Sequence, residues 1–288
     1  MSLKSAALAL ALTTALTPAA LADPAMWRVS DADSDIYLFG SVHILPPDTV
    51  WRTQQLDQLI ETADSFYYEI PMTEDAQTAS QSLIPQYGLN RNGNTLDGFL
   101  NEAERVQLDR VATSLGLSSR QLQPLQPWLA SITLSVLAMQ AQGYNPASGV
   151  EATLSRETAD ERENAFETYN EQFGFFSNLS QEVQTEFLLL TLDQLENEPD
   201  MLDELVGYWA VGDTEGLNTL FHASMMEAGQ EVYDALIVNR NTNWANDIVT
   251  QLEGDGTTLI IVGAGHLVGP DSVPQMLEDR GLTVERVQ

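Results

Sequence analysis

The stretch TTLIIVGAGH, residues 257–266, decides the fold of this chain. Its first six residues form a nearly continuous, β-branched apolar run that ends at glycine, a pattern typical of a strand covered on both faces of a sheet. Two similar runs lie near the other end of the chain, IYLF at 36–39 and SFYY at 65–68. We therefore predict an α/β fold in which a mostly parallel or mixed sheet pairs this C-terminal strand with the N-terminal ones.

Helical patterns fill most of the sequence between these strands. Apolar residues recur there at the three- and four-residue spacings of amphipathic helices. The predicted helices span residues 52–63, 128–140, 181–195, 201–210, 231–252 and 270–279. Weaker patterns at 27–29 and 282–284 predict edge strands. Because the sheet unites both ends of the chain around a large helical insertion, we predict one domain over residues 23–288.

The first 22 residues have the pattern of a signal peptide. Lys4 precedes an apolar stretch at 6–16, and the small-x-small triplet ALA at 20–22 matches a cleavage site. The apolar stretch is too short for a comfortable membrane span, and no later segment approaches the roughly 18 apolar residues that a span needs. We therefore predict export to the periplasm or the extracellular space, with cleavage after Ala22.

The overall composition is strongly acidic. The sequence has 42 acidic and 12 basic residues, a formal net charge of −30, and no cysteine. Such a surface repels nucleic acid and anionic lipid, and the lack of cysteine rules out disulfides and thiol catalysis. The acidic residues are spread along the chain, which favours a role in solubility, although a cationic substrate is an alternative. Nothing here identifies the substrate, for which we expect a peptide or a small molecule.

Two short motifs of the form Gly-x-x-His each follow a predicted strand. They are GSVH at 40–43 and GAGH at 263–266, and Glu69 ends a third strand. Ligands of open α/β sheets bind beyond the carboxyl ends of the strands, so His43, Glu69 and His266 are predicted to share one pocket. Two imidazoles and a carboxylate are a familiar ligand set for a catalytic divalent metal. The residues alone leave two structural histidines as an equal alternative.

Other chemistry-bearing residues give weaker signals. His222 lies in a helical stretch with no acidic partner at ligand spacing, so we interpret it as structural. Ser41 lacks the surroundings of a nucleophilic serine. The sequence also has no His-Glu-x-x-His, Gly-x-Ser-x-Gly or phosphate-binding loop. The pair of Gly-x-x-His motifs is therefore the main candidate.

Several motifs, in order along the chain, resemble those of the TraB/GumN family, to which the Tiki metalloproteases also belong. One departure is the charged stretch at 158–164, where the family usually has a short apolar strand, so we expect a degenerate strand there. The matching motifs are YLFGSVH at 37–43, AD at 63–64 with Glu69, GVE at 149–151, FET at 166–168 with EQ at 171–172, RN at 240–241 with WA at 244–245, and VGAGHLVG at 262–269.

The resemblance implies a metal-dependent, protease-like hydrolase that uses the two Gly-x-x-His motifs and a glutamate. His43 and His266 would then hold a divalent ion such as manganese, zinc or cobalt. Glu69 would be a further ligand or the general base. Arg240 is a candidate for binding an anionic group of the substrate, either a developing oxyanion or a carboxylate, or equally for an ion pair that ties a helix to the core.

The sequence leaves three other hypotheses open. The first is metal-free, esterase-like hydrolysis with His43 as general base, because erythromycin-esterase-like hydrolases belong to the same superfamily. The second is a module that binds haem or another ligand without turnover, as a haem-binding lipoprotein of that superfamily does. The third is a scaffold with a vestigial site. Glu151 and Glu167 are interpreted as structural rather than catalytic. The alternative is that they contact and support the residues that bind the metal or the substrate.

Overall fold

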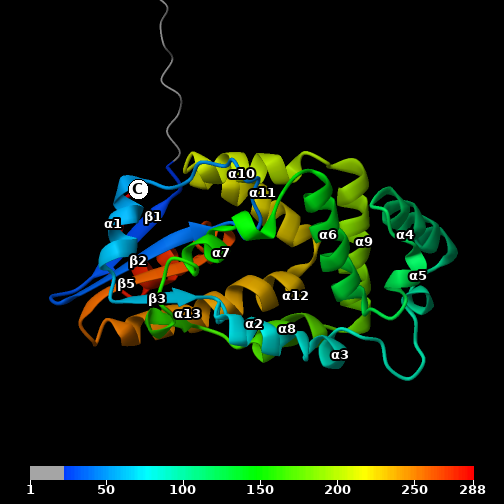
Figure 1. The fold of residues 1–288 in the computed structure, drawn as a ribbon, viewed down its shortest axis with the longest axis horizontal. Helices are drawn as coiled ribbons and strands as arrows, with labels where there is room; N and C mark the ends of the chain where they lie inside the picture. Colours follow the sequence, from blue (N-terminus) through cyan, green and yellow to red (C-terminus); the bar gives the residue numbers. More distant parts are fainter. Residues whose placement is uncertain (1–22) are drawn as a thin grey trace, which may run out of the picture.

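The computed structural model describes residues 23–288, so the predicted signal peptide at 1–22 lies outside the described residues. The fold is α/β, as predicted, with a six-stranded mixed sheet in the order β4-β3-β5-β2-β1-β6 (Figure 1). The strands are β1 (Met26–Ser30), β2 (Ser34–Ser41), β3 (Ser65–Tyr68), β4 (Glu163–Ala165), β5 (Gly256–Gly263) and β6 (Val284–Arg286).

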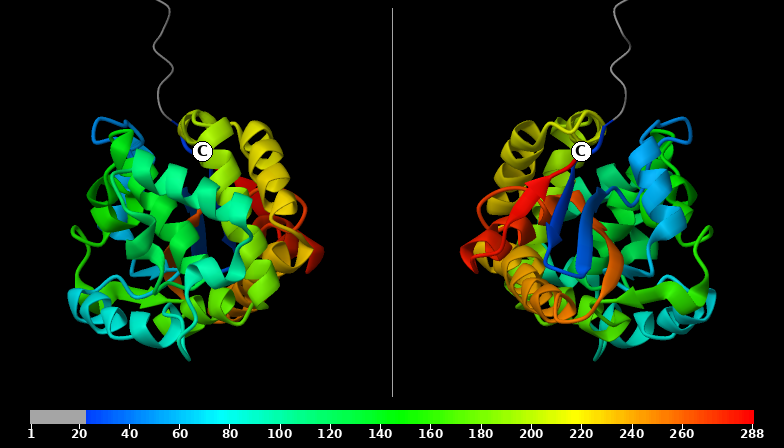
Figure 2. Two further views of the ribbon diagram at one scale, coloured as in Figure 1. Left: turned by 90° about the vertical axis from the view of Figure 1, so that its right-hand side faces the viewer. Right: turned by 90° about the vertical axis from the view of Figure 1, so that its left-hand side faces the viewer.

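The C-terminal strand β5 lies between two N-terminal strands, which confirms the predicted pairing. β5 is parallel to β2 on one side and to β3 on the other, with Ile260 opposite both Leu38 and Tyr67. β4 is parallel to β3, whereas β1 is antiparallel to β2 and to β6. The strands β2, β3 and β5 therefore end at the same edge of the sheet, towards the middle of Figure 1, whereas the right-hand view of Figure 2 faces the side from which β2 and β5 start.

Two of the shorter strands differ from the prediction. The segment predicted at 27–29 as an edge strand is β1, which lies inside the sheet between β2 and β6. Its side chains at Met26 and Val29 are fully buried, because Met26 packs in the cluster on one face of the sheet and Val29 in the cluster on the other. The segment predicted at 282–284 becomes strand only from Val284 and is a true edge. The charged stretch at 158–164 ends in the short edge strand β4, as expected for a degenerate strand.

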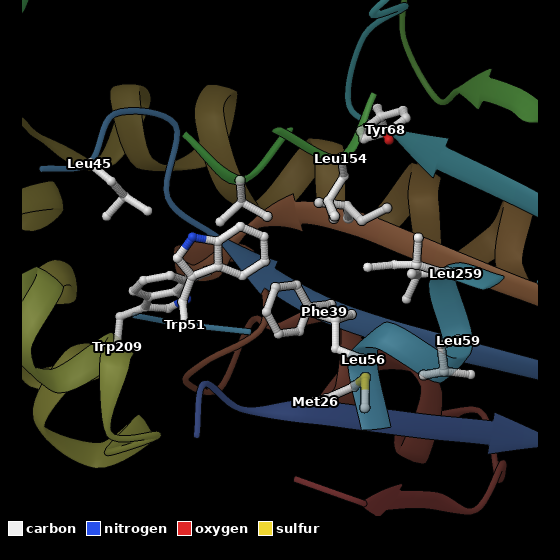
Figure 3. Packing of buried hydrophobic residues seen from close by; sticks show 14 of the residues in the cluster. Met26, Phe39, Leu45, Trp51, Leu56, Leu59, Tyr68, Leu154, Trp209 and Leu259 are labelled. Carbon is white, nitrogen blue, oxygen red and sulfur yellow. The ribbon is translucent and has the colours of Figure 1, made fainter. Parts of the chain in front are cut away.

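Both faces of the sheet are covered, which explains the continuous apolar runs in the sequence. Leu259 and Ile261 of β5 pack on one face with Phe39 (Figure 3). Ile260 and Val262 pack on the other face. Burial of each such side chain contributes roughly 1.5–3 kcal/mol before the opposing entropy of ordering. Successive residues of a strand point to opposite faces, so a strand covered twice needs apolar residues at every position.

Over residues 23–288 the chain forms fourteen α-helices. Some cover the sheet, and others form a separate helical half, in which α4, α6 and α9 pack on one another. No helix between residues 23 and 288 is long and apolar enough to span a membrane. The bounds are α1 (Gln54–Thr62), α2 (Glu74–Gln81), α3 (Ile84–Tyr87), α4 (Glu102–Ser114), α5 (Ser119–Leu122), α6 (Pro127–Ala141), α7 (Val150–Leu154), α8 (Tyr169–Ser177), α9 (Gln181–Asn197), α10 (Met201–Ala210), α11 (Thr214–Glu227), α12 (Gln230–Tyr233), α13 (Asn239–Gln251) and α14 (Val273–Asp279).

The helix predicted at 231–252 is interrupted. The segment Asp234–Val238 forms a π-helical turn between α12 and α13. Such turns shift the phase of a helix and are frequent at functional sites. Here the turn directly precedes Arg240 and Asn241, whose side chains are buried at the edge of the sheet where the strands end.

Candidate active site

The structure brings His43, Glu69 and His266 together at the carboxyl edge of the sheet. His43 follows β2, Glu69 follows β3 and His266 follows β5. The Nε2 atoms of His43 and His266 lie 4.0 and 3.9 Å from the same atom, Oε1 of Glu69. Side chains more than 190 residues apart in sequence therefore meet because parallel strands end side by side.

Glu69 is the centre of this group and is 6% exposed. Its Oε1 accepts a hydrogen bond from the Gly263 backbone N–H at 2.7 Å, which ties it to the end of β5. Its Oε2 accepts from Arg240 at 2.6 Å and from Gln172 at 3.4 Å. Burial alone would raise the pKa of Glu69, but the Arg240 guanidinium, with the His43 imidazolium, outweighs burial and lowers it. Glu69 is therefore an anion in the folded protein.

His43 is held by a carboxylate from helix α7, which packs on the sheet. Its Nδ1 lies 2.7 Å from Oε1 of Glu151, which also accepts the hydroxyl of Ser41. The Glu151 charge, more than any other neighbour, raises the pKa of His43 to about 9. The side chain remains 62% exposed, so its Nε2 is open to water. A histidine oriented at Nδ1 and free at Nε2 is the arrangement of a proton-transfer group.

The start of α7 explains how Glu151 reaches His43. The Val150 backbone N–H donates to the Val42 carbonyl at 3.1 Å, so the helix begins against the turn that carries His43. A Cβ atom at Gly149 would overlap the backbone carbonyl of His43. Only glycine permits this approach, which gives the GVE motif a physical reason.

His266 has the opposite character, because it is buried and neutral. The side-chain amide of Asn241 donates to the carbonyls of His266 and Asp271, so its Oδ1 must accept from Nδ1 of His266 at 2.6 Å. The Nε2 lone pair then accepts from Arg240 at 3.0 Å. Burial first, and the Arg240 charge second, lower the pKa of His266 to about 3. This ring stays unprotonated at neutral pH.

Arg240 joins the buried parts of the site and is 7% exposed. Its guanidinium makes two bonds to Glu167 at 2.7 and 2.8 Å, besides those to Glu69 and His266. Nη1 also donates to the Leu236 carbonyl of the π-helical turn at 3.2 Å. Each nitrogen of the guanidinium thus already donates to the protein. Of the two roles predicted for Arg240, this arrangement favours the ion pair that ties a helix to the core.

The two histidines should titrate far apart, and nuclear magnetic resonance of their Cε1–H protons will measure this. In the wild type we expect a midpoint near pH 9 for His43 and no titration of His266 above about pH 5. Glu151→Gln removes the charge that raises the pKa of His43, so its midpoint should fall toward the ordinary value of about 6.5. Because the folded pKa of His43 is raised, its stabilising contribution is complete below about pH 6.5 and is lost as the pH rises through about 9. A His43 midpoint unchanged in Glu151→Gln would contradict the pairing.

The donor atoms of the site also allow a test of the predicted metal. Over residues 23–288, no three His, Asp or Glu side chains stand close enough to hold an ion as they are. Even so, both histidines are held at Nδ1 and face Glu69 Oε1 with Nε2, the way in which histidine ligands are oriented in metal sites. The donor set thus fits a divalent metal in chemistry and orientation. A metal ion could bind at Nε2 of His266 only after the Arg240 N–H that donates to this atom has moved away.

Three residues of the site were not predicted from the sequence to act in it. Glu151 and Glu167, interpreted there as structural, hold His43 and Arg240, and Asn241 fixes the ring of His266. Their partners are between 25 and 108 residues away, so local spacing gave no signal, although each lies in a motif of the family resemblance. His222, interpreted as structural, packs edge-on against Tyr233 with ring centroids 5.2 Å apart.

Comparisons with known proteins find related chains but no related structure. A model of the TraB/PrgY/gumN family matches residues 25–286. The chain is 21% identical to the uncharacterized protein YbaP of Escherichia coli strain K12, over 88% of this chain and 92% of YbaP. It is 23% identical to the metalloprotease TIKI homolog of Amphimedon queenslandica, over 91% of this chain and 61% of that protein. No solved structure matches.

Proposed function

Since the chain belongs to the TraB/PrgY/gumN family, we propose that it is a hydrolase. In this proposal His43 takes a proton from the attacking water and passes it to the leaving group. The observation that carries this proposal is the state of His43, with Nδ1 held by Glu151 and Nε2 open to solvent. The similarity to a protein named as a metalloprotease supports peptide or related acyl bonds as the substrate class. The test compares the rate of peptide hydrolysis by the wild type with the rate by His43→Ala.

In this proposal, Glu151 sets the tautomer and charge of His43. Because Glu151 accepts from Nδ1–H, neutral His43 presents its lone pair at Nε2 and takes a proton from an attacking water. The imidazolium that forms is stabilised by Glu151 and returns the proton to the leaving group. With a His43 pKa of about 9, the neutral form increases up to that pH, so we expect the rate to rise over the same range.

The buried residues form the frame around this step. Oε1 of Glu69 faces the same space as His43 Nε2, but its lowered pKa makes it a weak base. We assign Glu69 an electrostatic role, since an anion there favours positive charge on His43. Arg240 and the Gly263 backbone N–H hold Glu69 in place, and the Arg240 guanidinium prevents its burial from leaving an unpaired charge.

A second candidate is metal-assisted hydrolysis, favoured by the two Nε2 atoms that face Glu69 Oε1. His43, His266 and Glu69 would hold the ion, which would lower the pKa of a bound water and polarise a carbonyl. Both imidazoles must be unprotonated to bind. The raised pKa of His43 therefore makes protons compete with the metal up to about pH 9, and affinity should increase with pH over that range.

Calorimetric titration with manganese, zinc and cobalt separates the two candidates. If metal is used, the wild type should bind one ion tightly in moderate salt, where loose binding to the acidic surface is screened. His43→Ala and His266→Ala should then each remove most of that binding. His222→Ala is the matched control and should bind like the wild type. Equal binding by all four proteins would reject the metal site and leave the metal-free mechanism.

We also propose that the protein is exported, supported by the ALA triplet that precedes residue 23. The expected cleavage after Ala22 would release a chain that begins at Asp23. N-terminal sequencing of the exported protein will show this. A mature protein that still begins with Met1 would contradict the proposal.

A further inference from the structure

A second feature of interest lies in the helical half rather than at the sheet. Helices α4, α6, α9, α10 and α11 surround a cavity of about 670 Å³, within the range of pockets that bind drug-sized ligands. Three methionines contribute to its wall, and their flexible side chains adapt to a ligand. The apolar side chains that line it include Met139, Phe187, Leu190, Met201, Leu202 and Met225.

The polar side chains of the cavity wall are largely paired within the protein. Gln194 donates to Ser224 at 3.1 Å, and Gln142 donates to a backbone carbonyl at 3.2 Å. Arg110 is paired with Glu196. An occupant would therefore find few free hydrogen-bond partners. A peptide backbone buried there would leave its amides unsatisfied, at a considerable cost, whereas an aliphatic chain needs no such partners.

Helix α11 connects this cavity to the candidate active site. The ring of Phe221 fills the space beside Gly265, where a Cβ atom would overlap it, so this helix packs directly on the turn that carries His266. Ser224 and Met225 line the cavity three and four residues further along α11. That spacing is about one helical turn, or roughly 5 Å. The cavity wall thus begins about one helical turn along α11 from Phe221, the residue that contacts the turn of the second Gly-x-x-His motif.

We propose that the cavity binds the aliphatic chain of an acylated substrate whose hydrolysable bond lies at His43. This inference rests on the proposed hydrolase function and adds the substrate class to it. The net charge of −30 repels an anionic amphiphile such as a free fatty acid, and the apolar wall favours an uncharged chain. The apolar wall, the paired polar groups and the contact through α11 all support such a chain.

The test measures binding without turnover. A neutral fluorescent probe, N-phenyl-1-naphthylamine, is bound to the purified protein and displaced by n-alkanols from hexanol to dodecanol. Affinity should increase about fourfold for each added methylene until the cavity is full. Met225→Glu places a charge in the cavity wall and should weaken binding of decanol at least tenfold. Met226→Glu is the matched control, because Met226 is 39% exposed on the same helix, and it should bind like the wild type.

His43→Ala separates this proposal from the proposed function. This variant should lose hydrolysis but bind alkanols like the wild type, so a failure of catalysis leaves the cavity testable. No saturable binding by the wild type, or equal binding by Met225→Glu and Met226→Glu, would overturn the proposal. Displacement of the probe by a neutral apolar peptide but not by alkanols would also overturn it and assign the cavity to a peptide segment.

Discussion

Arg240→Met should lower the free energy of unfolding by about 3–5 kcal/mol, the usual effect of breaking a buried ion pair from one side. The side chains of Arg240, Glu69 and Glu167 are only 7–8% exposed. Methionine preserves much of the volume but removes the charge and every N–H donor. Glu167 would then be buried without a cation, Glu69 would keep only the His43 imidazolium 4.0 Å away, and His266 would lose the donor to its Nε2.

Urea unfolding of the purified variant will measure this effect, with Arg110→Met as the matched control. Arg110 also pairs with a glutamate, but its side chain is 60% exposed, and exposed pairs contribute little to stability. We therefore expect no measurable change in the unfolding midpoint of the control. Equal effects of the two substitutions would contradict the central position of Arg240 in the buried frame.

His43→Ala should reduce kcat/KM by roughly 10²–10⁴-fold, the usual contribution of a proton-transfer group. The fold should survive, because the side chain of His43 is 62% exposed. His266→Ala should lower stability more, because the buried Oδ1 of Asn241 loses its donor and Arg240 loses one of its acceptors, and it should lower activity as well.

Rate measurements paired with thermal unfolding will distinguish these effects. The unfolding midpoint of His43→Ala should fall modestly at neutral pH, because the variant loses the charged pair with Glu151, but the variant should stay folded while its rate collapses. His222→Ala is the control, because His222 belongs to neither Gly-x-x-His motif and packs on Tyr233. It should retain full activity. A His43→Ala variant that keeps the wild-type rate would remove His43 from the mechanism.

The sheet was predictable from the sequence because its central strands are covered on both faces. A strand of this kind is apolar at every position, so β5 and β2 were recognisable without any partner. The meeting of His43, Glu69 and His266 followed from the same logic, because parallel strands end at one edge. The position of β1 inside the sheet was not predictable, since the pattern at 27–29 does not reveal the antiparallel partner β6.

The residues that control the histidines were harder to predict. Glu151 reaches His43 from a helix more than 100 residues away, through a close approach at Gly149 that depends on tertiary packing. The π-helical turn before Arg240 likewise leaves no clear mark on the apolar spacing. Short polar helices such as α2 escaped prediction because no side chain of this helix is buried, so it has no apolar stripe.

The most direct measurement is hydrolysis in water enriched in ¹⁸O, with a mixture of plain and N-acylated peptides as the substrate and mass spectrometry as the readout. Hydrolysis inserts one oxygen from water into each new carboxyl group, which identifies water as the nucleophile. If His43 activates that water, the wild type will release ¹⁸O-labelled products and His43→Ala, purified in the same way, will release almost none. Labelled products in equal yield from both proteins, or none from the wild type, would contradict a hydrolytic site at His43.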